Sequence, residues 1–270
     1  METFFFIPVQ KLAKVPHYLE DNLVDHIIID LEESLRPSEF ELFVDQLLNL
    51  ENKDKIWVRP LLRVSFADPI QLDMVRGLIK LGFTKFIWPK LISGEELIAI
   101  ENEFDANKIV SIPLIEHPRL LADMHMVLSK LKFEFVGIGN HDFFTITNER
   151  NTPDNLNFLR RAVSYAVKAW GIQIIDTACM ELNNDEALLR EIKDAIDIGY
   201  DAKFFIHPKQ LNVFYSNKYF SDEEISWAKS IVELVESQGG VSQFVPQRYN
   251  GKIVERPHVK WALKILKLSK

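Results

Sequence analysis

The sequence predicts an α/β fold, a (β/α)₈ TIM barrel followed by a C-terminal extension. Short apolar runs rich in Ile, Val and Phe alternate with longer amphipathic stretches, as in a parallel sheet covered by helices. About eight such strand–helix units are complete by residue 215, and eight is the number that closes a barrel. The length of 270 residues agrees, because single barrels typically contain about 250 residues.

The expected strands read as continuous apolar runs, which is typical of strands that are buried on both faces. They are expected at residues 4–7, 26–30, 56–59, 85–88, 109–115, 133–138, 173–176 and 203–206. Apolar residues at helical spacing predict helices between them, among others at 37–50, 154–170 and 185–198. A doubly wound open sheet is the structural alternative, but no Gly-x-Gly-x-x-Gly motif follows the first strand.

The chain continues past the eighth expected strand. A helix is expected at 221–238, Gly239-Gly240 interrupts it, and a last helix is expected at 258–268. We therefore divide the chain into a barrel domain, residues 1–238, and a C-terminal segment, residues 239–270. Two glycines followed by a polar connector indicate a hinge, so we expect this segment to act as a lid or as an arm to a neighbouring subunit.

Composition narrows the class of function. A net charge of −7 and a pI of about 5.6 argue against nucleic acid or an anionic membrane as partner, because both require a basic surface. Cys179 is the only cysteine in the sequence, which excludes a disulfide framework and a cysteine-rich metal site within one chain. The first apolar run is too short for a signal peptide, and no run approaches the ~18 apolar residues of a membrane span. We therefore expect a cytoplasmic protein.

Ionisable residues follow seven consecutive expected strands. In barrel enzymes the carboxyl ends of the strands form the active site. The residues in question are Asp30, Glu32, Arg59, Lys90, Glu116, His117, His141, Asp142, Asp176 and His207. One acidic residue after a strand would cap a helix as readily as it would serve a site, whereas a complete ring of such residues favours an active site.

Short motifs in a fixed order connect the chain to a known family. They are Phe-Ile-Pro at 6–8, Asp-Leu-Glu-Glu at 30–33, Val-Arg at 58–59, Pro-Lys at 89–90, Leu-Ile-Glu at 114–116, Gly-x-x-Asp at 139–142, Ile-Asp at 175–176, Ile-His-Pro-x-Gln at 206–210 and Gly-x-x-Val-Glu-Arg-Pro at 251–257. Through them the chain resembles the citrate lyase β-subunit and malyl-CoA lyase group of the HpcH/HpaI aldolase superfamily over nearly its whole length. The resemblance implies a carbon–carbon lyase or aldolase that forms a homo-oligomer, a trimer or hexamer.

The resemblance also implies a metal site. Glu116 and Asp142 match the family residues that bind Mg²⁺, and two carboxylates leave octahedral positions for water and substrate oxygens, as Mg²⁺ prefers. Arg59 matches the arginine that holds the substrate carboxylate and stabilises a developing enolate. Asp30 and Glu32 are expected to assist catalysis by orienting water at the metal. A structural floor of the site is the equally weighted alternative for Asp30.

The remaining candidates carry open alternatives. Lys90, Asp176 and His207 are expected to contact substrate, with an ion pair to Glu32 or Glu116 as the alternative for Lys90. Asp176 and His207 would otherwise lock loops together. Glu255 stands at the position of a C-terminal family acid that serves as general acid or base, often in the active site of a neighbouring subunit.

Two histidines depart from the family pattern. His141 and His117 stand where the family has Glu and Thr, and their roles stay open, as does the choice between a CoA thioester and a free acid as substrate. The predicted function is a Mg²⁺-dependent lyase acting on a small keto or hydroxy acid, or its CoA thioester, through an enolate. A thioesterase or synthase is a close variant. The alternative from a different class is a catalytically degenerate barrel that binds a metabolite or a partner protein.

Overall fold

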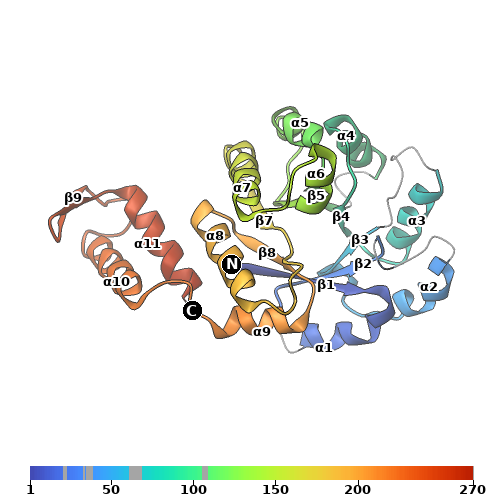
Figure 1. Ribbon diagram of the computed structural model, residues 1–270, viewed down its shortest axis with the longest axis horizontal. Coiled ribbons are helices and arrows are strands. Elements are labelled where there is room, and N and C mark those ends of the chain that lie inside the picture. The colour runs from blue at the N-terminus through green and yellow to red at the C-terminus, as the bar shows by residue number, and fades with distance from the viewer. Residues whose placement is uncertain (21–22, 33, 35–38, 61–68, 105–108, 270) are drawn as a thin grey trace. The chain divides into compact units, whose positions relative to one another are not determined.

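The structure is a computed structural model that describes residues 1–20, 23–32, 34, 39–60, 69–104 and 109–269. Eight parallel strands close into a barrel in sequence order, and β1 is hydrogen-bonded to both β2 and β8. They are β1 (Glu2–Pro8), β2 (His26–Asp30), β3 (Ile56–Arg59), β4 (Lys85–Trp88), β5 (Val110–Ile115), β6 (Phe135–Ile138), β7 (Gln173–Asp176) and β8 (Ala202–Phe205). Figure 1 shows helices around these strands. The predicted (β/α)₈ barrel is confirmed, and each observed strand end lies within two residues of the expected one.

Helices follow the strands in the order that the periodicity predicts. They are α1 (Val15–Glu20), α2 (Phe40–Leu48), α3 (Pro69–Lys80), α4 (Gly94–Glu103), α5 (Pro118–Leu128), α6 (Asn140–Thr147), α7 (Pro153–Lys168), α8 (Asp185–Ile198) and α9 (Pro208–Ser216), with the 3₁₀ helices η1 (Val9–Lys14) and η3 (Lys53–Lys55). The helix expected at 37–50 is α2, and residues 37 and 38 lie outside the described residues. The side chain of Thr152 caps α7 by accepting a hydrogen bond from the Asn155 N–H, which explains where this helix begins.

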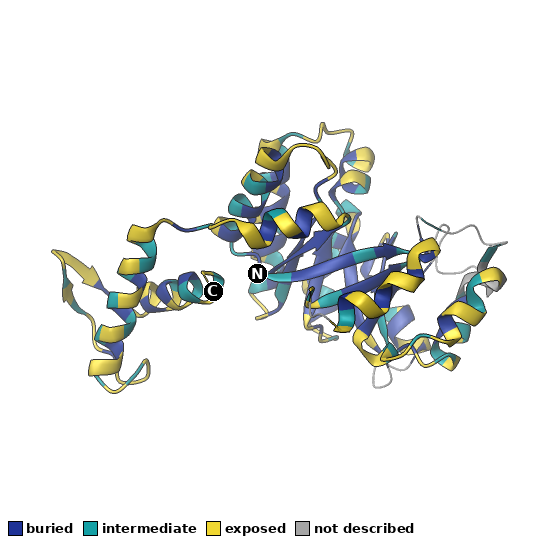
Figure 2. Ribbon diagram, turned by 90° about the horizontal axis from the view of Figure 1, so that it is seen from below, coloured by how far each residue is buried: buried dark blue, intermediate teal, exposed yellow. Residues whose placement is uncertain are grey.

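Side chains alternate along each strand between the barrel interior and the helix layer. One buried cluster fills the interior: Phe4, Ile28, Trp57, Ile87, Ile112, Leu114, Phe135, Ile175, Ala202 and Phe204. Figure 2 shows the strands as mostly buried, with exposed residues on the outer turns of the helices. At the carboxyl end of a strand, the residue two positions after an interior residue therefore points into the mouth of the barrel. The residue between these two points at the helices.

The chain divides into two compact units, Met1–Asn212 and Val213–Lys270. The second unit contains α10 (Asp222–Ser237), the hairpin β9 (Gln247–Tyr249) and β10 (Lys252–Val254), and α11 (Arg256–Leu268). A capping box formed by Ser221 and Glu224 begins α10. The helix expected at 221–238 is present, but it belongs to the C-terminal unit, so the division falls after residue 212 and not after the expected residue 238.

Among the described residues, no helix combines the length and the apolar character that crossing a membrane requires.

Candidate active site

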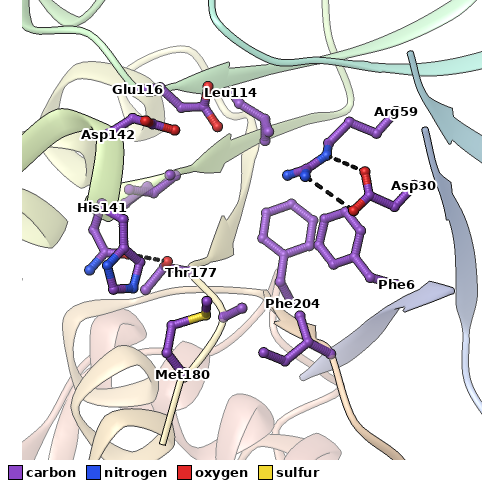
Figure 3. Close-up of a pocket in the computed structure, with 15 residues that line it drawn as sticks. Phe6, Asp30, Arg59, Leu114, Glu116, His141, Asp142, Thr177, Met180 and Phe204 are labelled. Atoms are coloured by element: carbon purple, nitrogen blue, oxygen red, sulfur yellow. Dashed lines mark hydrogen bonds and ion pairs between the residues drawn. The ribbon is translucent and has the colours of Figure 1, made fainter. Parts of the chain in front are cut away.

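A cavity of about 390 Å³ opens where the carboxyl ends of the barrel strands meet. Residues of β1, β2 and β3 reach it, as do residues after β5, β6 and β7. The charged lining residues are Asp30, Arg59, Glu116 and Asp142, all of which the sequence predicts as site residues. Figure 3 shows the Arg59 guanidinium and the Glu116 carboxylate pointing towards each other across this space.

Arg59, the last residue of β3, is held by two carboxylates. Its Nε donates to Oδ1 of Asp30 at 2.8 Å and its Nη2 to Oδ2 at 3.2 Å, while Nη2 lies 2.8 Å from Oε2 of Glu32. The guanidinium also lies over the Phe6 ring, 5.0 Å from its centroid. Burial alone would lower the pKa of Arg59, but the charges of Asp30 and Glu32 outweigh it and raise the pKa. Arg59 is therefore a fixed cation on one wall of the cavity.

Glu116 follows β5 and is buried, with only 5% of its surface exposed. Its carboxylate rests against Gly139, and its Oε2 accepts a hydrogen bond from the backbone N–H of Lys90 at 2.7 Å. Burial raises the pKa of Glu116 to about 7, although the Lys90 N–H and the charges of Lys90 and Arg59 act in the opposite direction. The nearby charge of Asp142 raises this pKa further. The protein thus places a carboxylate where its negative charge is poorly solvated.

Asp142 lies in the first turn of α6, and Figure 3 shows its carboxylate beside that of Glu116. Gly139, the residue between β6 and α6, carries no side chain that would displace Glu116. The described residues contain no group of three or more His, Cys, Asp or Glu side chains arranged for a metal. Mg²⁺ does not require such a group, because it retains several waters and takes hard oxygen ligands from one or two carboxylates. The donor set therefore fits Mg²⁺.

Lys90, just after β4, does not line the cavity in the part of the chain that the structure describes. Its Nζ lies 2.5 Å from Oδ2 of Asp142 and 3.7 Å from Oε1 of Glu32. Burial alone would lower the pKa of Lys90, but the hydrogen bond to Asp142 and the neighbouring carboxylates raise it. The geometry thus matches the ion-pair alternative for Lys90, with Asp142 as a partner that the sequence does not indicate.

Asp176, predicted to contact substrate, is fully buried and points into the helix layer. Its Oδ1 accepts from Nε of Arg160 at 2.8 Å, and its Oδ2 accepts from Nη2 of Arg160 at 2.9 Å and from Nζ of Lys203 at 2.7 Å. Lys203 also donates to the Thr177 carbonyl at 2.7 Å and to Glu191 at 3.2 Å. Burial would raise the pKa of Asp176, but Arg160 and Lys203 lower it overall. Asp176 therefore joins α7, β7 and β8, as in the loop-locking alternative.

His207 and His117 are not among the described residues that line this cavity. His207 is exposed, and its Nδ1 accepts a hydrogen bond from the Lys209 N–H at 3.1 Å. His117 caps α5 in the same way, because its Nδ1 accepts from the Arg119 N–H at 3.1 Å. Both histidines thus satisfy helix N-termini. Glu255 is an exposed residue of the C-terminal unit, where its N–H donates to Nδ1 of His258 at 3.1 Å.

Several lining residues were not predicted from the sequence. Phe6 and Phe204 form an apolar wall, with their ring centroids 5.2 Å apart. Thr177 also lines the cavity and donates from Oγ1 to the side chain of Asn140. The alternation of side chains along the strands could have predicted them. Phe6 and Thr177 each stand two positions after a residue of the barrel interior, and Phe204 belongs to that interior.

The loop after β7 is fastened to the end of β8 by one buried side chain. Gln210 donates from Nε2 to the Cys179 carbonyl at 2.7 Å and accepts from the Ile206 N–H at Oε1 at 3.1 Å. Ile206 and Met180, the residue after Cys179, both line the cavity.

His141 lines the cavity as well, close to Met180 and Thr177 in Figure 3.

The relatives of this chain among known proteins include a citrate lyase subunit and a citramalyl-CoA lyase. Citrate lyase subunit beta of Leuconostoc mesenteroides subsp. cremoris is 23% identical over 265 residues, which cover 91% of this chain and 85% of that protein. The mitochondrial citramalyl-CoA lyase of Mus musculus is 28% identical over 144 residues, 52% of this chain. The match spans only 41% of the mouse protein's length.

Solved structures share the fold. Protein CitE from Mycobacterium tuberculosis, in complex with magnesium, acetoacetate and coenzyme A, superposes with a TM-score of 0.80 at 18% identity, covering 99% of this chain and 97% of that one. The citrate lyase beta subunit from M. tuberculosis complexed with oxaloacetate and magnesium gives a TM-score of 0.66 at 19% identity, covering 78% of this chain and 94% of that one.

These relatives are named as lyases, in agreement with the prediction of a carbon–carbon lyase. The match to the family description HpcH/HpaI aldolase/citrate lyase extends over residues 5–208, well over half of the sequence. The matched residues form the closed eight-stranded barrel, and the chain belongs to the HpcH/HpaI aldolase/citrate lyase family of enzymes.

Proposed function

We propose that this chain is a Mg²⁺-dependent carbon–carbon lyase or aldolase that acts on a small keto or hydroxy acid, or on its CoA thioester, through an enolate. The observation that supports this most directly is the arrangement of Glu116 and Asp142 beside each other, opposite Arg59, in one cavity. Carbon–carbon cleavage next to a carboxylate needs a site that binds the carboxylate and stabilises negative charge on the adjacent oxygen. The cavity offers groups for both tasks.

The side chains divide the work as follows. Mg²⁺, when held by Glu116 and Asp142, supplies Lewis-acid stabilisation of the charge that develops on the substrate oxygens. Arg59 binds the substrate carboxylate through its guanidinium N–H groups, and Asp30 and Glu32 fix the direction in which it points. Phe6 and Phe204 cover the reacting carbon and exclude water from it.

The proton transfer is assigned to the C-terminal unit. Glu255 takes the proton from the substrate hydroxyl in cleavage and donates it in condensation, in its own or a neighbouring subunit. We further propose that residues 239–270 act as a lid or as an arm to a neighbouring subunit, and that the enzyme is a homo-oligomer, a trimer or hexamer, in the cytoplasm. The CitE complex with coenzyme A supports a CoA thioester as one form of the substrate.

Titration calorimetry of the full chain with Mg²⁺ tests the proposal. The wild type, Asp142→Asn and the control Asp54→Asn, a change on the exposed surface of η3, are compared with and without oxaloacetate or pyruvate. We expect the wild type and the control to bind Mg²⁺ more tightly with the keto acid, and Asp142→Asn to lose binding. A turnover assay for a keto-acid product accompanies it.

Full activity of Asp142→Asn would contradict the proposed metal site. If the wild type bound neither Mg²⁺ nor keto acid and showed no turnover, the catalytic proposal would be rejected in favour of a non-catalytic binding barrel.

A further inference from the structure

One residue contacts both proposed metal ligands. The backbone N–H of Lys90 donates to Oε2 of Glu116 at 2.7 Å, and its Nζ lies 2.5 Å from Oδ2 of Asp142. The same ammonium is 3.7 Å from Oε1 of Glu32. Lys90 therefore lies among these carboxylates and is not among the described residues that line the cavity.

The backbone of Lys90 is adapted to these contacts. Its φ angle of 57° lies in the left-handed region, which a residue with a β-carbon rarely adopts. Such a conformation persists where surrounding interactions compensate for it, and it occurs most often at functional sites. Here it allows the N–H and the side chain of one residue to serve two neighbouring carboxylates.

Around Lys90, the charged groups that the structure describes include more carboxylates than cations. The described carboxyl groups are those of Asp30, Glu32, Glu116 and Asp142, and the described cations beside them are Arg59 and Lys90. Without the Lys90 ammonium, Asp142 and Glu32 would lose a counter-charge.

Arg59 and Lys90 differ in the freedom to move. The Arg59 guanidinium is fixed by paired hydrogen bonds to Asp30, whereas the Lys90 ammonium is a point charge on a flexible stem with 31% of the side chain exposed. A divalent cation that binds Asp142 would have to share this carboxylate with the ammonium or displace it. The two cations compete for the same carboxylate.

We propose that Lys90 is a built-in counter-cation that holds Asp142 and Glu32 in the metal-free protein and moves off Asp142 when Mg²⁺ binds. Lys90 is then a positioning residue that limits Mg²⁺ affinity and stabilises the empty site. This inference rests on the proposed function, because it assumes that Asp142 is a metal ligand.

Calorimetry with Mg²⁺ and thermal denaturation in EDTA test this inference on the full chain. We expect Lys90→Met to bind Mg²⁺ about tenfold more tightly, because a repelling charge within contact distance of the metal ligand is removed. In EDTA the same variant should melt at a lower temperature than the wild type, since its carboxylates have lost a counter-charge. Lys90→Arg keeps the charge and should stay within about threefold of the wild-type Kd. Lys132→Met, an exposed position, is the matched control and should change neither quantity.

Each other outcome is decisive. Unchanged or weaker Mg²⁺ binding by Lys90→Met would overturn the competition, and Lys90→Gln repeats the measurement if the Met variant does not fold. If Mg²⁺ binds the wild type but not Asp142→Asn while the Lys90 variants match the wild type, only the Lys90 inference fails. If the wild type itself binds no Mg²⁺, the metal-dependent function fails, and the inference fails with it.

Discussion

A β-carbon on Gly139 would lie 2.5 Å from both Cγ and Oε1 of Glu116. The Glu116 carboxylate, proposed as a metal ligand, thus rests against the backbone of the residue that precedes α6, the helix that carries Asp142. The absence of a side chain at residue 139 would let the carboxylates of Glu116 and Asp142 approach one cation.

Gly139→Ala should therefore weaken Mg²⁺ binding by about 10- to 100-fold, the range seen when groups that orient a ligand are lost. Calorimetry measures the change. Gly77→Ala, in α3, is the control, since a β-carbon there has nothing within 4 Å, and it should leave binding unchanged. Equal binding by both variants would mean that Glu116 does not need this contact to reach the metal.

The stability of the metal-free protein should depend on pH through Glu116. Its pKa is raised from 4.5 to about 7 in the fold, so between these values the folded carboxyl holds a proton that the unfolded chain releases. Its contribution to the free energy of unfolding is present in full below pH 4.5 and is lost as pH rises through 7, a change of roughly 3 kcal/mol. Urea denaturation in EDTA should show this loss in the wild type and not in Glu116→Gln.

Mg²⁺ reverses this pH dependence, because the metal binds only the deprotonated carboxylate. We expect Mg²⁺ affinity to increase as pH rises through about 7. A Kd that stays constant across this range would argue against Glu116 as a ligand.

Asp176→Asn should destabilise the fold and spare the metal site. The change leaves Arg160 and Lys203 buried without their principal counter-charge, which costs about 3–5 kcal/mol in comparable buried pairs. Chemical denaturation gives the loss, and calorimetry on the remaining folded protein should give a wild-type Mg²⁺ affinity. A stable variant with a raised KM would instead support the original prediction of a substrate contact.

Arg59→Lys should lower kcat/KM by about 10- to 100-fold, mainly through KM. Lysine keeps the charge but cannot hold Asp30 and a substrate carboxylate with one planar group. Steady-state kinetics with a series of keto acids measures the effect. A change in kcat alone would place Arg59 in transition-state stabilisation and not in substrate binding.

Glu255→Gln should lower kcat by about 10²- to 10⁴-fold, the usual contribution of a general acid or base, while Mg²⁺ binding stays at the wild-type level. Glu255 is exposed and is also the N-cap residue of α11, so thermal denaturation of the variant should accompany the kinetics to separate a lost cap from lost catalysis. A wild-type kcat would mean that Glu255 is not the general acid or base.

The barrel and half of its site follow from local rules. Apolar runs predict all eight strands, and residues in phase with the core, such as Asp30, Arg59 and Glu116, do reach the cavity. The same phase explains the difference at Asp176. Ile175 belongs to the barrel interior, so Asp176 faces the helices and Thr177 faces the cavity. The fact that both residues stand at the end of a strand does not by itself show which of them faces the cavity.

Other features depend on contacts that no local pattern encodes. The pair Lys90–Asp142 joins residues 52 positions apart, through loops whose paths depend on the complete barrel. The membership of α10 in the C-terminal unit likewise depends on its packing with α11, and its helical periodicity is the same in either arrangement.

Gln210 has a mechanical consequence for ligand exchange. Because its amide links the Cys179 carbonyl to the Ile206 N–H, the rim segments after β7 and β8 are tied together. A ligand that pushes Met180 outward would pull on Ile206 as well, so this quarter of the rim should widen or narrow as one piece. The affinity for substrates of different size would then depend on how easily this part of the rim moves, and not only on the shape of the cavity without a ligand.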